Sequence, residues 1–103
     1  MGEQNILEYL KTVCAGRKNT RKSAEIERAL NISSKELRRL VNRLRRKGTP
    51  IGSSKDGYFY AITAGEVYST IRQLRVMAKG LEEAIQGLET ALDTFSLRNT
   101  GGD

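Results

Sequence analysis

The residues best equipped for chemistry are cationic side chains between Ser34 and Lys47. When the segment is plotted at about 100° per residue, its leucines and valine fall on one helical face. The opposite face carries one amide, Asn42, and the cations Lys35, Arg38, Arg39, Arg43 and Arg46. Arginine can donate two hydrogen bonds to guanine, asparagine can pair with adenine, and outer cations can bind phosphates. The pattern predicts a helix that lies in the major groove of double-stranded DNA.

We expect the two ends of this helix to make different contacts. The residues expected to read bases are Ser34, Lys35, Arg38, Arg39 and Asn42. The residues expected to contact phosphates are Arg43, Arg46 and Lys47, assisted by Lys18, Arg21 and Lys22. Lys55 lies at the tip of a predicted hairpin, from which it can touch the neighbouring groove or the DNA backbone.

Charge is divided unevenly along the 103 residues, whose net charge is +6. Residues 1–63 contain fourteen Lys and Arg against six Asp and Glu, whereas residues 64–103 contain four against six. A surface that serves only solubility would not usually divide in this way. The basic part therefore predicts a polyanionic partner, and the remainder is expected to have another task.

Two helices are predicted upstream of the basic segment. Apolar residues recur at helical spacing over Asn5–Val13, which indicates the first helix. Thr20 is a candidate N-cap for a second helix that ends at Leu30. The turn that follows contains Asn31, one of the few residues other than glycine that tolerate a left-handed backbone.

Local signals also delimit the basic helix and the elements after it. Ser33 and Glu36 form an S-x-x-E capping box, and Gly48 is a good C-terminal stop. Two extended segments follow, Ile51–Ser53 and Tyr58–Ile62, and the Asp-Gly pair that ends Ser54–Gly57 favours a hairpin turn between them.

Three helices followed by a hairpin are the plan of a winged helix-turn-helix. We therefore predict a mainly α fold with a small β-hairpin, of the α+β class, over residues 1–63. The recognition helix of such a domain would run from Ser34 to Lys47, with Lys55 on the wing.

This part of the chain resembles a known family. The residues that carry the resemblance are Leu30-Asn31-Ile32-Ser33, Leu37, Leu40, Leu44, Arg45-Arg46-Lys47-Gly48 and Gly57-Tyr58-Phe59. They resemble the winged-helix domain of biotin-operon repressors, and equally small winged-helix proteins of phages and prophages in Gram-positive bacteria. The resemblance covers residues 5–62. It implies that the second of the paired helices enters the major groove and that the hairpin forms the wing.

Two departures from that family are visible. The glycine usual in the turn between the paired helices is Asn31 here. The biotin ligase domain has no counterpart in these residues, so the resemblance implies no enzymatic role.

A long helix is predicted from a second capping box, Thr63 and Glu66, to about Leu97. From Val67 onward its apolar residues alternate steps of four and three, which is a heptad pattern. We expect the first two turns to pack on their own domain and the rest to mediate dimerisation, through Leu74, Ala78, Leu81, Ile85, Leu88, Leu92 and Phe95. Residues 64–97 thus form a predicted dimerisation helix, and residues 98–103 a predicted disordered tail.

The positions beside this apolar stripe bear on the orientation of the two helices. Isoleucine at heptad position a with leucine at d favours a parallel pair. Small residues at g and charged residues at e favour an antiparallel pair, which brings Arg75 near Glu89 or Asp93. We expect the antiparallel arrangement. Gly80 and Gly87 fall on the outer side, and the sequence offers no explanation for them.

Other chemistry is sparsely represented. The chain has no histidine, a single cysteine and no phosphate-binding loop, so we expect no enzyme activity, cofactor, metal or small-molecule ligand. Cys14 is expected to be partly buried rather than nucleophilic. Alternation in the hairpin is expected to put at least Phe59 or its neighbours in the core, so we do not expect the aromatic run Tyr58–Tyr60 to stack on single-stranded bases. No apolar run is long enough to span a bilayer and no secretion signal is evident, which predicts a cytoplasmic protein.

Together these patterns predict a homodimeric protein that binds specific sequences in double-stranded DNA. Its expected role is regulation of transcription or maintenance of phage or plasmid DNA. One alternative is a protein that organises replication at an origin and recruits other proteins through its C-terminal helix. Another is an adaptor whose winged-helix domain binds protein and whose basic helix is merely solvated.

Overall fold

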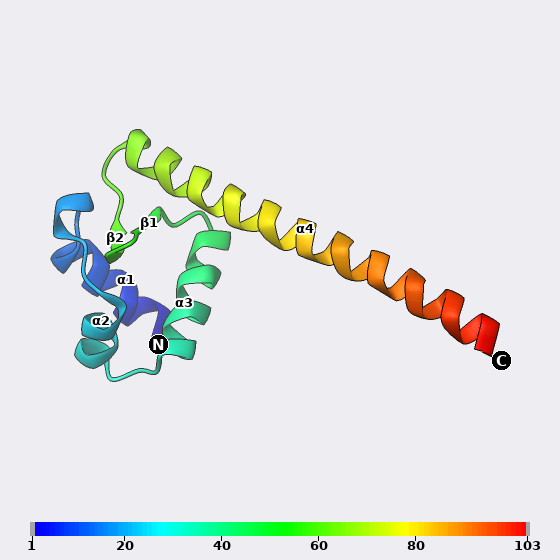
Figure 1. Cartoon of the computed structure of the whole chain (residues 1–103). Coiled ribbons are helices and arrows are strands. Elements are labelled where there is room, and N and C mark those ends of the chain that lie inside the picture. The colour runs from blue at the N-terminus through cyan, green and yellow to red at the C-terminus, as the bar shows by residue number, and fades with distance from the viewer. Residues whose placement is uncertain (1, 103) are drawn as a thin grey trace. The chain divides into compact units, whose positions relative to one another are not determined.

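The structure, a computed structural model, describes the backbone of residues 2–102 and the side chains of residues 2–95 (Figure 1). The elements in chain order are α1 (Gly2–Val13), the 3-10 turn η1 (Arg17–Asn19), α2 (Ser23–Leu30), α3 (Ser34–Arg46), β1 (Ile51–Ser54), β2 (Gly57–Tyr60) and α4 (Ala64–Gly102). They fall into two units, one that ends at Ile71 and one that begins at Arg72. The predicted α+β class, with three helices, a hairpin and a long C-terminal helix, is confirmed.

The core of the first unit is enclosed by α1, α2, α3 and the hairpin. Its buried apolar residues are Ile6, Leu10, Cys14, Ile26, Leu37, Leu40, Val41, Leu44, Ile51, Phe59 and Ala61. The members from α1 and α3 recur at three- and four-residue spacing, so each helix contributes a single face. The apolar face predicted for the basic helix is therefore confirmed.

Phe59 and Cys14 are both fully enclosed in this core, at 1% and 0% exposure. The ring of Phe59 lies so close to Gly52 that a Cβ there would approach it to 2.2 Å. Phe59 is thus unavailable for stacking on a base, and Tyr58 and Tyr60 are half-buried against the same core. Burial also raises the pKa of the Cys14 thiol, which disfavours the reactive thiolate.

The ends of α3 follow the predicted local signals. Asn31 is left-handed, at φ 56°, and it ends α2. Ser33 is the N-cap of α3, and its hydroxyl accepts a hydrogen bond of 3.1 Å from the Glu36 amide. At the other end Gly48 is left-handed, at φ 96°, and the amide of Thr49 donates to the carbonyl of Leu44. These bonds satisfy groups that a helix end leaves unpaired.

The prediction that Thr20 caps the second helix is wrong. The N-cap of α2 is Lys22, without a side-chain bond, and the hydroxyl of Thr20 donates to the Arg17 carbonyl instead. The reason is a backbone pairing in which Arg21 and Tyr58 each donate to the other's carbonyl, at 3.1 and 3.0 Å. This bridge holds Arg21 outside the helix, and α2 begins at Ser23.

β2 is the strand that organises the sheet. It pairs with β1 in antiparallel register from Ile51–Tyr60 to Ser54–Gly57, so the tight turn consists of Lys55 and Asp56. Its other edge carries the bridge to Arg21 and a second bridge to Ala15. The strands differ by one or two residues from the predicted Ile51–Ser53 and Tyr58–Ile62, since β1 includes Ser54 and β2 runs from Gly57 to Tyr60.

The start of α4 is fixed by Glu66. Thr63 accepts a hydrogen bond from the Glu66 amide at 3.1 Å, as the predicted capping box requires. The Glu66 carboxylate accepts from the amides of Arg17, at 3.0 Å, and Ile62, at 2.8 Å. These backbone donors, that of Arg17 first, lower the pKa of Glu66. The carboxylate thus joins η1, the end of the hairpin and the first turn of α4.

The first two turns of α4 pack on the first unit, as predicted. Val67 lies against the core, and the buried hydroxyl of Thr70 accepts from the Ser53 amide at 3.1 Å. From Ile71 to Phe95 every side chain is exposed. The helix continues to Gly102, beyond the predicted end near Leu97. The predicted tail at 98–103 lies outside the residues whose side chains are described.

Within residues 2–102, none of the helices has both the length and the apolar content that crossing a membrane requires.

Replacing Gly57 by alanine is expected to destabilise the first unit by more than about 2 kcal/mol. Gly57 has φ 139°, and a Cβ there would lie 1.9 Å from the Arg21 carbonyl oxygen. Urea unfolding followed by tyrosine fluorescence measures this unit alone, because the chain has no tryptophan and its tyrosines all precede Ile71. Gly48→Ala is the control: its φ is also positive but its surroundings are open. An equal loss in both variants would contradict the close approach.

Replacing Glu66 by glutamine is expected to lower stability at pH 7 and to have little effect at low pH. The pKa of Glu66 is lowered from its ordinary 4.5, so its contribution is complete above that value and disappears as pH falls through the lowered pKa. Tyrosine-detected urea midpoints at pH 7 and pH 3 measure the change. Glu8→Gln, an exposed carboxylate on α1, is the control. A gap of constant size at both pH values would refute the role of the charge.

Candidate nucleic-acid interface

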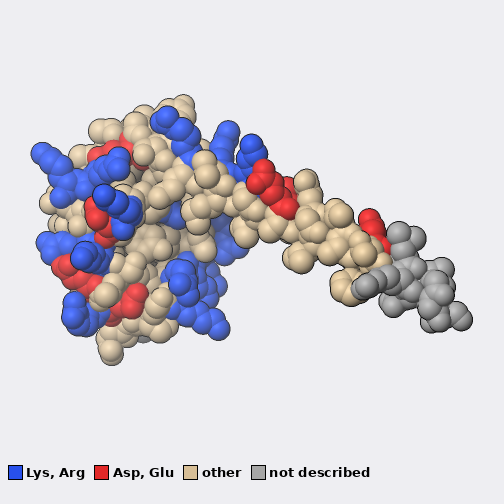
Figure 2. Space-filling model, viewed as in Figure 1, with Lys and Arg blue, Asp and Glu red and all other residues tan. Residues whose placement is uncertain are grey.

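Four predicted residues share an open face of α3. Lys35, Arg38, Asn42 and Arg46 are exposed, and no hydrogen bond or ion pair joins their side chains to any residue that the structure describes. Their direction follows from the burial of the opposite face, because turning the helix would bury charge and expose leucine. Figure 2 shows Lys and Arg gathered over α3. These side chains are therefore free to donate to an external acceptor.

Arg39 also faces outward, but it is paired within α3. Its Nε and a terminal nitrogen donate to the two carboxylate oxygens of Glu36 at 3.0 and 2.7 Å. This fork lowers the pKa of Glu36. Both side chains are roughly two-fifths exposed or more, and exposed pairs of this kind contribute about 0–1 kcal/mol. Arg39 can therefore exchange Glu36 for another anion at small cost.

Arg43 and Lys47 share a carboxylate that the sequence did not point to. Glu3, in the first turn of α1, accepts from Lys47 at 2.6 Å and from Arg43 at 3.3 Å. The hydrogen bond from Lys47 is the main cause of the lowered pKa of Glu3. The two cations are thus held close enough to share one anionic group, and together they still exceed the charge of that group.

Arg45 is the cation of α3 that does not belong to this surface. Its Nε donates to the Ile51 carbonyl at 2.9 Å, and a terminal nitrogen donates to the Ser53 hydroxyl at 3.1 Å. The guanidinium also lies 5.8 Å from the centre of the Tyr58 ring. Burial lowers the pKa of Arg45, although an arginine stays charged. Arg45 therefore fastens the end of α3 to the hairpin.

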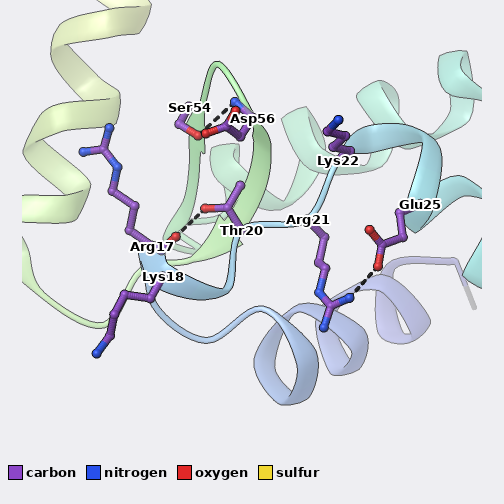
Figure 3. A pocket seen from close by; sticks show the side chains of 8 residues that line it. All are labelled: Arg17, Lys18, Thr20, Arg21, Lys22, Glu25, Ser54 and Asp56. Atoms are coloured by element: carbon purple, nitrogen blue, oxygen red, sulfur yellow. Dashed lines mark hydrogen bonds and ion pairs between the residues drawn. The ribbon is translucent and has the colours of Figure 1, made fainter.

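The remaining predicted cations belong to other elements. Lys18, Arg21 and Lys22 line a hollow beside the hairpin turn, together with Arg17, Thr20, Glu25, Ser54 and Asp56 (Figure 3). Arg21 is turned toward Glu25, with which it forms an ion pair. None of the α3 residues described above lines this hollow. Lys55 is exposed at the adjacent turn.

The structure thus divides the predicted site residues into two groups. Ser34, Lys35, Arg38, Arg39, Asn42, Arg43, Arg46 and Lys47 lie on or at the end of α3, whereas Lys18, Arg21, Lys22 and Lys55 lie around the hairpin. The two carboxylates of the hollow, Glu25 and Asp56, reduce its positive potential. We therefore regard the α3 face as the stronger candidate site.

A second candidate interface occupies α4 beyond Ile71. The residues predicted to mediate dimerisation are all exposed there, and the large ones range from 36% for Leu74 to 71% for Leu88. A stripe of apolar side chains with this exposure is typical of a surface that associates.

Comparisons of the chain with models of protein families, with curated proteins and with solved structures give no match. The resemblance to biotin-operon repressors and to small phage winged-helix proteins therefore remains a prediction from the sequence.

Alanine substitutions of the adjacent residues Arg45 and Arg46 are expected to differ in their effect on the free energy of unfolding. Arg45→Ala removes two hydrogen bonds and an aromatic contact, and should lower the free energy of unfolding by about 2–3 kcal/mol. Arg46→Ala should change it by no more than about 0.5 kcal/mol, because the side chain has no partner among the described residues.

Tyrosine-detected urea unfolding measures both variants under the same conditions. Arg45→Lys is expected to recover only part of the loss, since an ammonium cannot reproduce the planar fork. Equal stability of the Arg45→Ala and Arg46→Ala proteins would contradict the fastening role of Arg45.

Proposed function

We propose that this protein binds specific sequences in double-stranded DNA as a homodimer, and that it regulates transcription or maintains phage or plasmid DNA. The observation that carries the proposal is the open face of α3. Lys35, Arg38, Asn42 and Arg46 are exposed there without partners among the described residues, on a helix whose other face is fixed in the core. Donors that are both directed outward and unpaired suit an acceptor-rich partner such as DNA.

In the proposed complex α3 enters the major groove. Arg38 and Asn42 read base edges near the middle of the helix, and Arg46 binds a phosphate near its end. Phosphates displace the carboxylates of Glu36 and Glu3 from Arg39, Arg43 and Lys47. Each displacement exchanges one exposed ion pair for another, so it opposes binding weakly.

The hairpin supports α3 and extends the contact. Arg45 holds the end of α3 against β1 through the bonds to Ile51 and Ser53. In the proposed complex Lys55, which is exposed at the turn between the strands, meets the DNA backbone beside the groove. A fixed angle between helix and hairpin restricts the orientations in which both can touch DNA, which favours specific over diffuse binding.

Dimerisation through α4 completes the proposal. A single recognition helix contacts few base pairs, and a second copy doubles the contacts and selects for two half-sites. The exposed apolar stripe from Leu74 to Phe95 supports this step.

Arg46→Ala and Arg38→Ala are expected to weaken DNA binding in different ways. Arg46→Ala should weaken binding to all sequences similarly and reduce the slope of log affinity against log salt by about 1, because one phosphate contact is lost. Arg38→Ala should relax the preference at one base position, which corresponds to about 1–3 kcal/mol. Fluorescence anisotropy over a salt series measures both effects, on a site selected from a random DNA pool.

A control in α4 removes more positive charge than either α3 variant does. The double variant Arg72→Ala with Lys79→Ala removes two cations that lie outside the apolar stripe, and it should bind DNA as the unaltered chain does. Unchanged affinity in both α3 variants, or an equal loss in the control, would refute the assignment. The selected sequences are informative too: a palindrome supports the proposed dimer, a direct repeat supports the origin-organising alternative, and no preference supports the adaptor.

A further inference from the structure

In the exposed part of α4, the residues of the apolar stripe and those beside it favour one way of pairing two helices. We propose that two copies of this helix pair antiparallel, in the register that places Glu83 of each copy at the twofold axis. The inference rests on the proposed homodimer and specifies how its surfaces meet. It is carried by three observations, namely the sizes of the stripe residues, the charges on one flank and the small residues on the other.

The first observation is a match of side-chain sizes across the proposed axis. In this register each layer joins heptad position a of one copy to position d of the other. The layers are Leu74 with Leu92, Ala78 with Leu88, Leu81 with Ile85, and Ile71 with Phe95. The small Ala78 thus meets a leucine, and the large Phe95 meets an isoleucine. No layer therefore joins two alanines or two phenylalanines.

A parallel pair in register packs the same residues poorly. It would set Ala78 against its own copy, which leaves a gap, and Phe95 against its own copy, which crowds the layer. It would also place the charged e residues Arg75, Glu82 and Glu89 beside apolar g residues of the other helix. The antiparallel register avoids all three of these faults.

The second observation is charge complementarity at position e. The register sets Arg75 of one copy beside Glu89 of the other, and the twofold axis repeats the pair. Glu82 meets its own copy at the centre of the same flank, which is a repulsive contact. Two attractive pairs surround this one, so the flank favours the register as a whole.

The third observation concerns the opposite flank. Position g carries Met77, Ala84 and Ala91, and the register sets Ala84 beside its own copy and Met77 beside Ala91. No charged side chain lies at these positions, and all three are exposed in the single chain. The small residues at the centre allow the two helix backbones to approach closely.

The arrangement has a consequence for the DNA site. In an antiparallel pair centred on Glu83, the two Ile71 residues lie about 36 Å apart along the coil, at about 1.5 Å per residue. Ile71 is the last residue of the first unit in each copy. One turn of DNA measures about 34–36 Å, so the points of attachment are separated by a distance comparable to that between successive major grooves.

Single cysteine substitutions in the full chain test the register. Ala84→Cys should form a disulfide-linked dimer on mild oxidation with glutathione disulfide, because the two residues face each other at the axis. Leu74→Cys should not, because its two copies lie about 27 Å apart along the coil and a disulfide needs Cα atoms within about 7 Å. In a parallel pair in register, Leu74 would face its own copy and crosslink. Cys14, at 0% exposure, does not compete.

A charge exchange provides a measurement that does not depend on cysteine chemistry. Arg75→Glu and Glu89→Arg should each raise the dimer dissociation constant about 5-fold, and the double exchange should restore it. A parallel pair predicts no such coupling, because Arg75 and Glu89 would face apolar residues. Analytical ultracentrifugation measures the constant.

The outcomes separate this register from the proposed function. A crosslink with Ala84→Cys alone, together with recovery in the double exchange, supports the register. A crosslink with Leu74→Cys, or none with either variant while light scattering gives a dimer mass, overturns the register and leaves the dimer intact. A monomer or tetramer mass for the unaltered chain overturns the dimer itself, whereas DNA binding is judged separately by the Arg38 and Arg46 variants.

Discussion

Leu37, Leu40, Val41 and Leu44 turn one face of α3 into the core, and none of them is more than 4% exposed. Burial of such a side chain stabilises the fold by about 1.5–3 kcal/mol, so the four together fix the rotation of the helix about its axis. A shift by one residue would expose leucine and bury arginine. The directions of the cations on the opposite face are therefore decided in the core rather than at the surface.

That constraint creates a second one. A short helix with so many cations on one side carries like charges at neighbouring positions, which destabilises it. The structure relieves this with carboxylates from different sources: Glu36 of α3 pairs with Arg39, while Glu3 of α1 pairs with Arg43 and Lys47. Arg45 is removed from the face altogether and serves the hairpin. The cations of the face left unpaired among the described residues are Lys35, Arg38 and Arg46.

The elements with strong local signals could be predicted from the sequence. Four features each depend on residues close together in the chain: the periodicity of α3, the serine N-cap, the left-handed Asn31 and the hairpin turn of Lys55 and Asp56. The N-cap of α2 was wrongly predicted at Thr20 because the neighbouring Arg21 pairs with Tyr58. Tyr58 is distant in the sequence, so local patterns do not indicate this pairing. The roles of Glu3 and Arg45 escaped for the same reason, although the position of Arg45 four residues after the buried Val41 was a faint signal. The candidate site was predicted as a set of cations, but which of them are occupied depends on tertiary contacts.

The two-sided pairing of β2 also determines when the first unit can be completed. On one edge the strand holds β1, and on the other it bonds to the segment between α1 and α2, where the Gly16 amide donates to the Tyr60 carbonyl at 2.8 Å and the Tyr60 amide donates to Cys14 at 2.8 Å. During synthesis the chain grows from its N-terminus, so this segment emerges long before its partner. Until Tyr60 has left the ribosome, the three helices can form and collapse together, but the backbone groups that later bond to β2 have only water to bond. Most of the first unit is therefore synthesised before β2, the strand that pairs with both of its neighbouring segments.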